Sequence, residues 1–441
     1  MTGRYKAYPE YKNSGVEWLG EIPLDWSMWK LAHAYNEIGS GTTPPTNNEE
    51  WFKGNVPWVT TGELREKIIT DTKKKLSNEA LNTYPTLRKH PVGSIAIAMY
   101  GATIGRLGIF GVEATTNQAC CVMGASQQIE NKYLFYWLWA FKEDIIRLSS
   151  GGGQPNINQE KVASLKISAP ELTEQQKIAN FLDHETAKID TLITKQEKLI
   201  ELLKEKRQAV ISHAVTKGLN PDAPMKDSGV EWFGEVPKHW VHSTLKHYSN
   251  VIDCKHITAE FFDSGIPLAS IGEVKGWFVD LLSAKYTNEK YYEELIGGGR
   301  KPQVGDIIYS RNATVGEAAI VRAGLAPFAM GQDVCLIKSN DELLPEFAMY
   351  VFHSGVISQQ LDLAMVGSTF KRINVDNIRN FALAIPPYQE QELIVEELEK
   401  LTSKYDKLVL NATNAIDLMK ERKIALISSA VTGKIDVRNW Q

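Results

Sequence analysis

The residues of this sequence that could do chemistry form no recognisable catalytic set. A phosphate-binding loop needs the pattern GxxxxGK[ST], whose backbone N–H groups surround a phosphate, and the sequence lacks it. Pro386-Pro387-Tyr388 resembles part of a methyltransferase loop but lacks the polar residue that should precede it. Asp263, Glu273 and Lys275 are residue types that a metal-dependent nuclease uses, yet their spacing does not favour a shared site. We therefore expect no catalytic residue in this chain.

The cysteines and histidines do not have the spacing of metal ligands either. Cys120, Cys121, Cys254 and Cys335 form no CxxC pair, and the 9 histidines include no HExxH. A zinc site or a disulfide framework would need more ligands at regular spacing. We expect reduced thiols, no metal and no cofactor bound by this chain.

The composition limits the remaining classes of protein. At about 100–200 residues per domain, 441 residues make two to four domains. The sequence has no apolar run that could cross a membrane and no apolar signal segment in its first residues, so we expect a cytoplasmic protein without membrane contact. Residues 1–170 carry 18 Lys and Arg against 16 Asp and Glu, whereas residues 218–387 carry 15 against 20. Because neither segment is strongly basic, the positive charge needed to bind a nucleic acid must come from local patches or from a partner protein.

The strongest feature of the sequence is an internal repeat with a period of about 215 residues, too long for a solenoid. Residues 14–18 return as residues 228–232, and Gly, Pro and Trp follow both segments at the same spacing. Other matches occur in the same order along both copies, and they predict a duplicated two-part module. They pair Val92-Gly93 with Val304-Gly305, Gly105 with Gly316, Gln118 with Gln332, Cys121 with Cys335, Asn158 with Asn374, Gln175 with Gln391, and Ala214-Val215-Thr216 with Ala430-Val431-Thr432.

The first part of each copy has the pattern of a mixed α+β domain. Short apolar runs between Gly, Pro, Asn and Thr predict buried strands at residues 92–99 and 304–309 and helices at residues 131–148 and 345–361. Asn158 and Asn374 are predicted to cap helices. An aromatic stripe in the first helix is expected to belong to the core rather than to a surface that stacks on bases. This stripe consists of Tyr133, Tyr136, Trp137 and Trp139.

The second part of each copy predicts a long helix. Residues 173–217 contain no Pro or Gly, and apolar residues recur three and four apart over more than four heptads, as in a coiled coil. Lone helices that are long and polar need a partner face, so we expect the two segments to pair antiparallel and to give the chain pseudo-twofold symmetry. The predicted seam comprises Ile178, Leu182, Ile189, Leu192, Leu199, Leu203, Val210, Ile394, Leu398, Leu401, Tyr405, Leu408, Met419 and Leu426.

The predicted fold class is α+β, with two similar globular domains separated by two long antiparallel coiled-coil helices. The expected boundaries are residues 1–170 for the first domain, with repeat segment 8–26, and residues 218–387 for the second, with repeat segment 223–240. The two long helices are expected at residues 171–217 and 388–433, before a tail of residues 434–441.

In this order and twice over, the motifs resemble the specificity (S) subunit of type I restriction–modification systems. The second copy lacks a clear counterpart of the first copy's Gly-Thr-Thr-Pro motif, and residues 47–90 and 255–300 barely align. The motifs that carry the resemblance are Gly15-Val16-Glu17-Trp18, Gly41-Thr42-Thr43-Pro44, Trp58-Val59-Thr60-Thr61-Gly62-Glu63-Leu64, Gly153-Gln154-Pro155-Asn156-Ile157-Asn158 and Glu174-Gln175-Gln176-Lys177-Ile178.

The resemblance implies a chain that recognises DNA but is not itself an enzyme. Two target-recognition domains would each read one half of a bipartite site on double-stranded DNA, and the helices would set the gap between the halves. Two methyltransferase (M) subunits would dock on the chain, and restriction/motor (R) subunits would join through them. S-adenosylmethionine, ATP and Mg would then be bound by these partner subunits.

Candidate DNA-binding residues are those whose side chains can donate to phosphates or to base edges. Three of them, the lysines at positions 73–75, fit a solvated turn equally well. In the first copy the candidates are Thr42, Thr43, Lys53, Arg65, Lys73, Lys74, Lys75, Arg88, Lys89, Arg106, Gln154 and Asn156. In the second copy they are Lys255, His256, Lys275, Arg300, Lys301, Arg311, Asn312, Lys371 and Arg372.

A protein of a different class, an adapter that binds one protein with each domain, fits the same architecture. Its binding would lack the steep salt dependence that neutralisation of phosphates produces. An enzyme that acts on its own has no supporting set of residues in this sequence.

Overall fold

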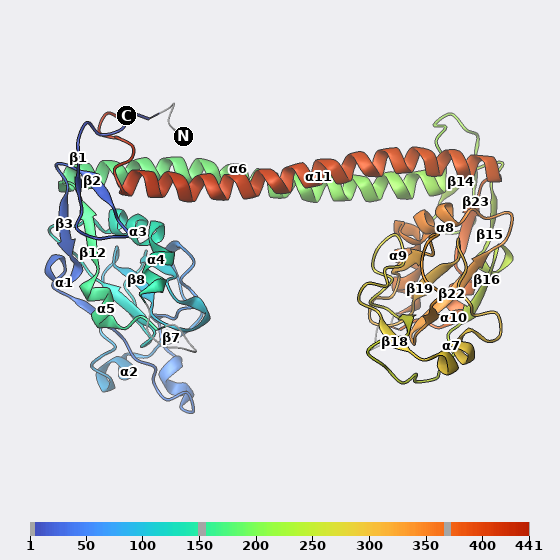
Figure 1. Ribbon diagram of the computed structural model, residues 1–441, viewed down its shortest axis with the longest axis horizontal. Helices are drawn as coiled ribbons and strands as arrows, with labels where there is room; N and C mark the ends of the chain where they lie inside the picture. The colour runs from blue at the N-terminus through green and yellow to red at the C-terminus, as the bar shows by residue number, and fades with distance from the viewer. Residues whose placement is uncertain (1–4, 149–155, 366–371, 441) are drawn as a thin grey trace. The chain divides into compact units, whose positions relative to one another are not determined.

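The computed structural model describes residues 5–148, 156–365 and 372–440, shown as a ribbon in Figure 1. They form two units, the first made of residues 1–196 with 414–441 and the second of residues 197–413. None of the helices in the described ranges is both long and apolar enough to cross a membrane. Each unit therefore combines one α+β domain with parts of both long helices.

Two sheets form the body of the first unit. The larger sheet has the order β4-β11-β8-β9-β6, in which only β6 and β9 pair in parallel. The smaller sheet has the order β10-β5-β7, with β10 parallel to β5. The strands are β4 (Ile38–Ser40), β5 (Val56–Val59), β6 (Lys67–Ile69), β7 (Lys75–Leu76), β8 (Ile95–Ala98), β9 (Leu107–Phe110), β10 (Thr115–Thr116) and β11 (Cys120–Met123).

The second unit repeats this arrangement. Its sheets have the orders β16-β22-β19-β20 and β18-β17-β21. The parallel pair of β17 with β21 corresponds to the pair of β5 with β10 in the first unit. A parallel bridge between Phe278 and Ile320 takes the place of the pairing of β6 with β9. The strands are β16 (Ser249–Asp253), β17 (Ile266–Ala269), β18 (Lys285–Thr287), β19 (Ile307–Ser310), β20 (Ala318–Ile320), β21 (Ala329–Met330) and β22 (Val334–Ser339). The predicted α+β class and the internal repeat are confirmed.

Further two-stranded sheets and short helices complete both units. The antiparallel pairs are β1 (Tyr11–Asn13) with β2 (Glu21–Pro23), β3 (Ser27–Lys30) with β12 (Lys166–Ala169), β13 (Met225–Asp227) with β14 (Glu235–Pro237), and β15 (Val241–Thr244) with β23 (Ala382–Ile385). The helices of the first unit are α1 (Leu31–Ala34), η1 (Glu49–Phe52), α2 (Asn78–Thr83), η2 (Gly101–Thr103), α3 (Asn131–Ala140), α4 (Lys142–Arg147) and α5 (Gln159–Ser164). Those of the second are η3 (Leu245–His247), α7 (Glu289–Ile296), α8 (Pro345–Phe352), α9 (Gly355–Ala364) and α10 (Val375–Arg379).

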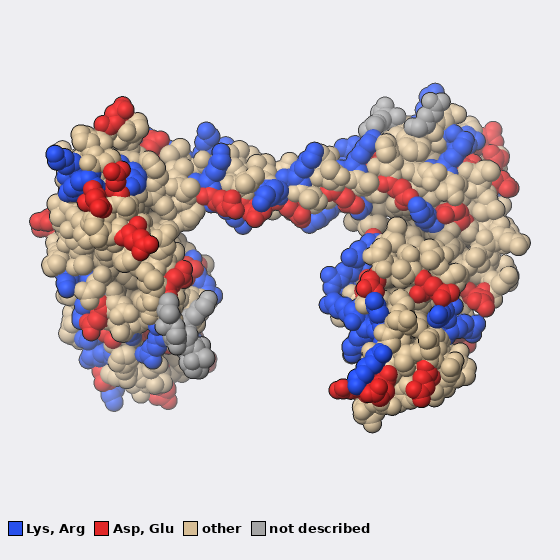
Figure 2. Space-filling view, turned by 180° about the vertical axis from the view of Figure 1, so that it is seen from behind, with Lys and Arg blue, Asp and Glu red and all other residues tan. Residues whose placement is uncertain are grey.

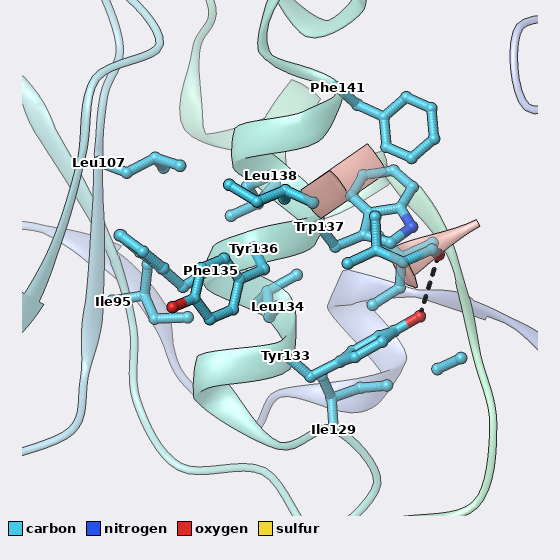
Figure 3. Packing of buried hydrophobic residues seen from close by; sticks show 14 of the residues in the cluster. Ile95, Leu107, Ile129, Tyr133, Leu134, Phe135, Tyr136, Trp137, Leu138 and Phe141 are labelled. Carbon is cyan, nitrogen blue, oxygen red and sulfur yellow. Dashed lines mark hydrogen bonds between the residues drawn. The ribbon is translucent and has the colours of Figure 1, made fainter. Parts of the chain in front are cut away.

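Helix α3 forms the centre of the core of the first unit, as Figure 3 shows. Tyr133 and Trp137 are fully buried and Tyr136 is 5% exposed, so their predicted place in the core is confirmed. The hydroxyl of Tyr133 donates to the carbonyl of Ser168 at 2.7 Å, which satisfies its only polar group. These three rings therefore stabilise the fold, whereas Trp139, the fourth residue of the stripe, is only partly buried, packs against the same core and has its ring centre 4.9 Å from the ammonium nitrogen of Lys423.

Asn158 and Asn374 cap helices as predicted, whereas four predicted elements are shorter than expected. The side chain of Asn158 accepts from the N–H of Lys161, and that of Asn374 from the N–H of Asn377. The strands begin only at residues 95 and 307, because the glycines at positions 93 and 305 adopt positive φ and make turns. Each predicted helix is divided in two, into α3 and α4 and into α8 and α9.

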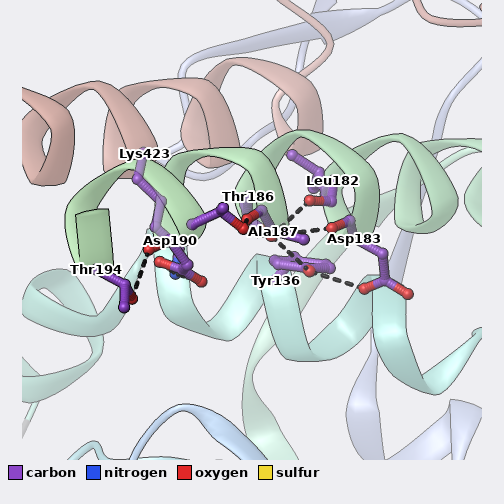
Figure 4. Close-up of polar contacts among 9 residues, drawn as sticks. Tyr136, Leu182, Asp183, Thr186, Ala187, Asp190, Thr194 and Lys423 are labelled. Carbon is purple, nitrogen blue, oxygen red and sulfur yellow. Dashed lines mark hydrogen bonds and ion pairs between the residues drawn. The ribbon is translucent and has the colours of Figure 1, made fainter.

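The long helices α6 (Leu172–Lys217) and α11 (Tyr388–Val431) pair antiparallel within each unit. In the first unit, Lys423 of α11 reaches both carboxylate oxygens of Asp190 of α6 at 2.7 Å, as Figure 4 shows. In the second, Arg207 of α6 binds Asp406 of α11 through two hydrogen bonds of 2.9 and 3.3 Å. Because the repeat relates these two ion pairs, each unit carries the same polar cross-link beside its apolar seam.

The predicted seam is buried mainly where the helices also cover a domain. Ile178, Leu182, Ile394 and Leu398 are fully buried. Leu192, Leu199 and Leu408 are 47%, 42% and 41% exposed, since two helices cover only one side of each other. Ile416, at 6% exposed, is a buried contact that the heptad pattern did not include.

The repeated Pro and Trp residues hold the ends of the long helices. The indole N–H of Trp26 donates to Glu174 at 3.2 Å, and that of Trp240 donates to Glu390 at 3.1 Å, near the first turns of α6 and α11. The glycine after α11, at position 433, has φ of 70°, and a Cβ there would lie 2.2 Å from Pro23. The repeated Pro and Trp residues therefore have a structural role: the buried Trp contacts the start of one long helix and the end of the other.

Candidate nucleic-acid interface

The loops that carry several of the sequence motifs gather at one end of the sheets in the first unit. The parallel strands β5 and β10 end side by side, and the N–H of Asn117 donates to the carbonyl of Val59 at 3.1 Å. The loop after β8 joins them, since the N–H of Met99 donates to Ala119 and the N–H of Ile157 donates to Met99, both at 2.8 Å. We call this set of loops, residues 41–44, 60–66, 99–106, 117–119 and 156–157, the loop end.

The second unit has the same loop end. The N–H of Gly331 donates to Ala269 at 2.8 Å, the N–H of Arg311 to Asp333 at 2.8 Å, and the N–H of Ile373 to Arg311 at 2.9 Å. These bonds match those of the first unit one by one, although the side chains differ. Arg311 occupies the position that Met99 has in the first unit.

A Thr–Gln pair lies at the surface of both loop ends. The hydroxyl of Thr43 donates to Gln118 at 2.5 Å, and the amide nitrogen of Gln332 donates to Thr258 at 3.1 Å. Thr258 is thus the counterpart of Thr43 that the sequence did not reveal, because the intervening loop differs in length. Gln118 and Gln332 were not predicted as DNA-binding residues, although the sequence repeat already matched them.

The structure brings about half of the first unit's candidates to the loop end. Arg65 donates to the carbonyl of Gly62 at 3.2 Å, and the N–H of Lys73 donates to Glu63 at 3.3 Å, so both adjoin the turn after β5. The candidates at or beside the loop end are Thr42, Thr43, Arg65, Lys73, Arg106 and Asn156. Gln154 lies outside the described residues.

The other basic candidates of the first unit lie elsewhere and have acidic or aromatic neighbours. In four cases the side-chain nitrogen lies 2.6–3.4 Å from a carboxylate, and in the fifth it lies over an aromatic ring. The pairs are Lys53 with Glu50, Lys75 with Asp71, Arg88 with Glu37, and Lys89 with Glu113, while Lys74 lies 5.3 Å from the centre of the Phe52 ring.

Most candidates of the second unit surround the end of β16. The side chain of Arg300 donates to the carbonyl of Asp253 at 2.8 Å, and His256 lies 3.5 Å from the Asp253 carboxylate. Asn312 and Arg372 form an antiparallel bridge, the equivalent of the bridge between Tyr100 and Asn156. The other described candidates are Lys255, Lys275, Lys301 and Arg311, and Lys371 lies outside the described residues.

Arg311 differs from the other candidates because its side chain is only 4% exposed. Its guanidinium lies 2.7 Å from the carboxylate of Asp253 and 3.7 Å from the sulfur of Cys254. Burial, and then the negative charge of Asp253, raise the pKa of the Cys254 thiol. Arg311 is thus placed to support the loop end from within.

Asp253, Cys254 and His256 bring three possible metal ligands within 4.8 Å of one another. Arg311 already provides the positive charge at Asp253, and the raised pKa keeps Cys254 protonated, whereas metal binding requires the thiolate. This group therefore suits an internal ion pair better than a metal ion. All four cysteines are free and buried.

Positively charged side chains on the surface visible in Figure 2 lie among negatively charged ones. On the face shown in Figure 2, Lys and Arg side chains gather along one side of the first unit, at the right of that view, with Asp and Glu among them. A surface of mixed charge attracts a polyanion only weakly at physiological salt. Such a surface can position a duplex, but it does not provide the strongly basic field of an independent DNA-binding protein.

A family model for the type I restriction modification DNA specificity domain matches this chain twice, over residues 25–202 and 238–416. The chain therefore belongs to the type I restriction–modification specificity family. This confirms the predicted resemblance and the predicted class, a specificity subunit and not an enzyme.

The chain is similar over nearly its whole length to a relative in Methanocaldococcus jannaschii. The MjaVIII specificity subunit of a type I restriction enzyme is 23% identical over 432 residues, with 95% of both chains covered.

Two solved structures have the same fold. One, from work on complex assembly and conformational transition of the type I R-M system, has a TM-score of 0.72, 16% identity and coverage of 94% of this chain and 99% of the other. The HsdS subunit from Thermoanaerobacter tengcongensis has a TM-score of 0.54, 15% identity and coverage of 94% and 98%.

Proposed function

We propose that this chain is the DNA-reading subunit of a type I restriction–modification complex, in which each unit reads one half of a bipartite site. The observation that carries the proposal is the loop end, which has the same backbone hydrogen bonds in both units but different side chains. A common frame with different side chains suits two readers of different sequences, because phosphate contacts position a protein whereas base contacts specify.

The long helices would set the gap between the two half-sites and provide the surface on which two methyltransferase subunits dock. Exposed leucines such as Leu192, Leu199 and Leu408 support docking, since an apolar surface of this kind is typical of a covered interface. Restriction/motor subunits would join through the methyltransferases. S-adenosylmethionine, ATP and Mg would be bound by those subunits and not by this chain.

The spacer role can be tested by shortening both helices by one heptad. Removal of residues 193–199 and 414–420 keeps the Asp190–Lys423 and Arg207–Asp406 ion pairs in register, because it removes facing stretches of an antiparallel pair. Seven residues rise about 10 Å, or about three base pairs of DNA. The assembled complex should then methylate sites whose gap is shorter by about that amount, and an unchanged gap would contradict the spacer role.

The DNA-reading role itself can be tested with the assembled complex by a salt titration of DNA affinity. Neutralised phosphates give a steep linear fall of log affinity with log salt. A flat dependence, together with tight binding of two proteins, would favour the adapter instead. Replacement of residues 27–170 by the corresponding domain of another family member should change only one half of the methylated sequence.

A further inference from the structure

Two grooves, one in each unit, are built from the same turn. In the first unit the turn follows β5, and its Glu63 accepts a hydrogen bond from the backbone N–H of Thr60 at 2.8 Å. In the second unit the turn follows β17, and Glu273 accepts one from Ser270 at 2.9 Å. Both turns lead into a segment that runs parallel to the next strand of the larger sheet. The two grooves are therefore equivalent under the internal repeat.

The walls of the two grooves come from matching positions. The groove of the first unit has about 290 Å³ and is lined by residues 62, 63, 65, 67–71 and 73. The groove of the second unit has a volume of about 820 Å³. Its lining includes the counterparts of all these positions except residue 73, and these counterparts are residues 272, 273, 275 and 277–281. Both grooves have a buried residue at the same position of the lining, since Ile69 is 3% exposed and its counterpart Val279 is 1% exposed.

The grooves share a frame and one cation. Gly62 and Gly272 precede the turn-forming glutamates, and a basic residue, Arg65 or Lys275, follows two positions later. Both basic side chains belong to exposed residues. A cation kept at one position in two otherwise divergent grooves suits a ligand feature common to both sites, such as a phosphate.

The remaining lining residues differ in chemistry. The first groove presents Lys67, Thr70 and Asp71, which can donate to or accept from base edges, with Ile68 52% exposed among them. The equivalents in the second groove are mainly apolar. They are Trp277, Phe278, Asp280 and Leu281, and the adjacent Leu282 also lines the groove.

The second groove exposes apolar side chains that the unit itself does not cover. Phe278 is 45% exposed, and Leu282 is 93% exposed. Arg322 lies 5.7 Å from the centre of the Phe278 ring and adds a cation beside this apolar surface. Apolar side chains recognise the methyl group of thymine or the face of an unstacked base, and neighbouring cations bind phosphates.

The grooves adjoin the loop ends. The turn of the second unit packs on the segment that carries Gln332, because a Cβ on Gly331 would lie 2.0 Å from the hydroxyl oxygen of Ser270. In the first unit, Asn117, the residue before Gln118, donates its N–H to Val59 directly before the turn. A duplex held at a loop end would therefore also reach the groove of that unit.

We propose that these duplicated grooves discriminate between the two half-sites, the first through polar contacts with base edges and the second through apolar contacts. This inference rests on the proposed function and adds to it the residues that determine specificity. The shared turn and its basic side chain, Arg65 or Lys275, hold the phosphate backbone of the DNA. The divergent side chains of the two grooves select the bases.

The test uses the chain assembled with its methyltransferase subunits and a DNA library with both half-sites randomised. The second-groove variant Phe278→Ser with Leu282→Ser should weaken discrimination at the second half-site by about tenfold or more, as loss of a base contact does, and leave the first half-site unchanged. The first-groove variant Lys67→Ala with Ile68→Ser should do the reverse. All four positions are exposed, so their substitution should not impair folding.

Val241→Ser serves as the matched control, since Val241 is 53% exposed in the second unit but does not line the groove. It should leave both half-sites unchanged. Methylation by the groove variants with unaltered discrimination would overturn the inference while leaving the proposed function intact. An equal loss of methylation at all sequences would also overturn it. Failure of the unmodified complex to methylate a bipartite site would instead contradict the proposed function.

Discussion

The guanidinium of Arg311 lies 2.7 Å from the carboxylate of Asp253, at the end of β16. In the first unit the positions equivalent to Arg311 and Asp253 are those of Met99 and Ser40. The strand registers establish the second equivalence, because Ser40 pairs with Cys121 as Asp253 pairs with Cys335. The second unit therefore supports its loop end with an ion pair, whereas the first unit has uncharged residues at both positions. The residues of the first unit can therefore be substituted into the second unit to measure how much the ion pair contributes to the free energy of unfolding.

Arg311→Met should destabilise the second unit, because Asp253 loses its charged partner while its side chain is only 33% exposed. Removal of one partner of a buried pair costs about 3–5 kcal/mol, and the partial exposure of Asp253 reduces this to about 1–3 kcal/mol. Arg311→Met combined with Asp253→Ser reproduces the pair of the first unit and should recover most of the loss. Urea unfolding of the four proteins gives the coupling energy, and strict additivity would show that the pair contributes nothing.

A buried glutamine fixes the start of each long helix. Gln175 is fully buried, accepts a hydrogen bond from the N–H of Glu130 at 2.8 Å, and donates to the carbonyls of Gln128 and Pro170 at 2.9 and 2.8 Å. Gln175→Met should lower the free energy of unfolding by about 2–4 kcal/mol, because three backbone groups, one of them buried and two partly buried, lose their partner.

Gln176→Met is the matched control for this prediction, since Gln176 is exposed on the same turn and should change stability by less than about 0.5 kcal/mol. Gln391 makes the equivalent three bonds in the second unit. Gln391→Met should therefore have an effect similar to that of Gln175→Met. A neutral outcome for both glutamine variants would contradict a structural role for the repeated motif.

His90 should make the stability of the first unit depend on pH. Burial, and then the positive charge of Arg88, lower its pKa from the ordinary value of 6.5. Between that value and the lower pKa of the folded protein, only the unfolded chain binds the proton. Stability is therefore complete above about pH 6.5 and falls as the pH decreases, by at most about 1.4 kcal/mol per pH unit.

Replacement of His90 by Leu should reduce this slope between pH 7 and pH 5, as measured by urea unfolding at several pH values, and leave the part that comes from His353, whose pKa burial also lowers. His33→Leu provides the control, because His33 is exposed and its substitution should leave the slope unchanged. A slope in His90→Leu equal to that of the unmodified chain would contradict the role of His90.

The sequence predicts the features of the chain that depend on local patterns. Heptads predict α6 and α11, side-chain type predicts the caps at Asn158 and Asn374, and the repeat predicts two similar α+β domains. The pairing of strands two to six residues long depends on contacts far apart in the sequence, so the registers could not be predicted.

The same limitation applies to the candidate site. In β5 and the turn after it, only Pro57, Gly62 and Glu63 are identical to their counterparts in and after β17, and the residues between them change size. Such sparse identity is too weak to align two divergent loops. The hydrogen bonds of the turns and the paired Thr and Gln residues reveal the equivalence because backbone geometry persists after side chains diverge.

The two surface Thr–Gln pairs should contact DNA without regard to its sequence. Gln118 and Gln332 occupy the same place in two loop ends that differ at most other positions, so we expect them to contact a feature present in both half-sites, the phosphate backbone. Gln118→Ala with Gln332→Ala should weaken DNA binding of the assembled complex by about 1.5–3 kcal/mol per contact, equally for matched and mismatched sites. The salt slope should stay unchanged because glutamine is uncharged. Gln127→Ala is the control, because Gln127 is an exposed glutamine of the first unit that does not belong to the loop end. A loss confined to one half-site would assign these residues to base recognition instead.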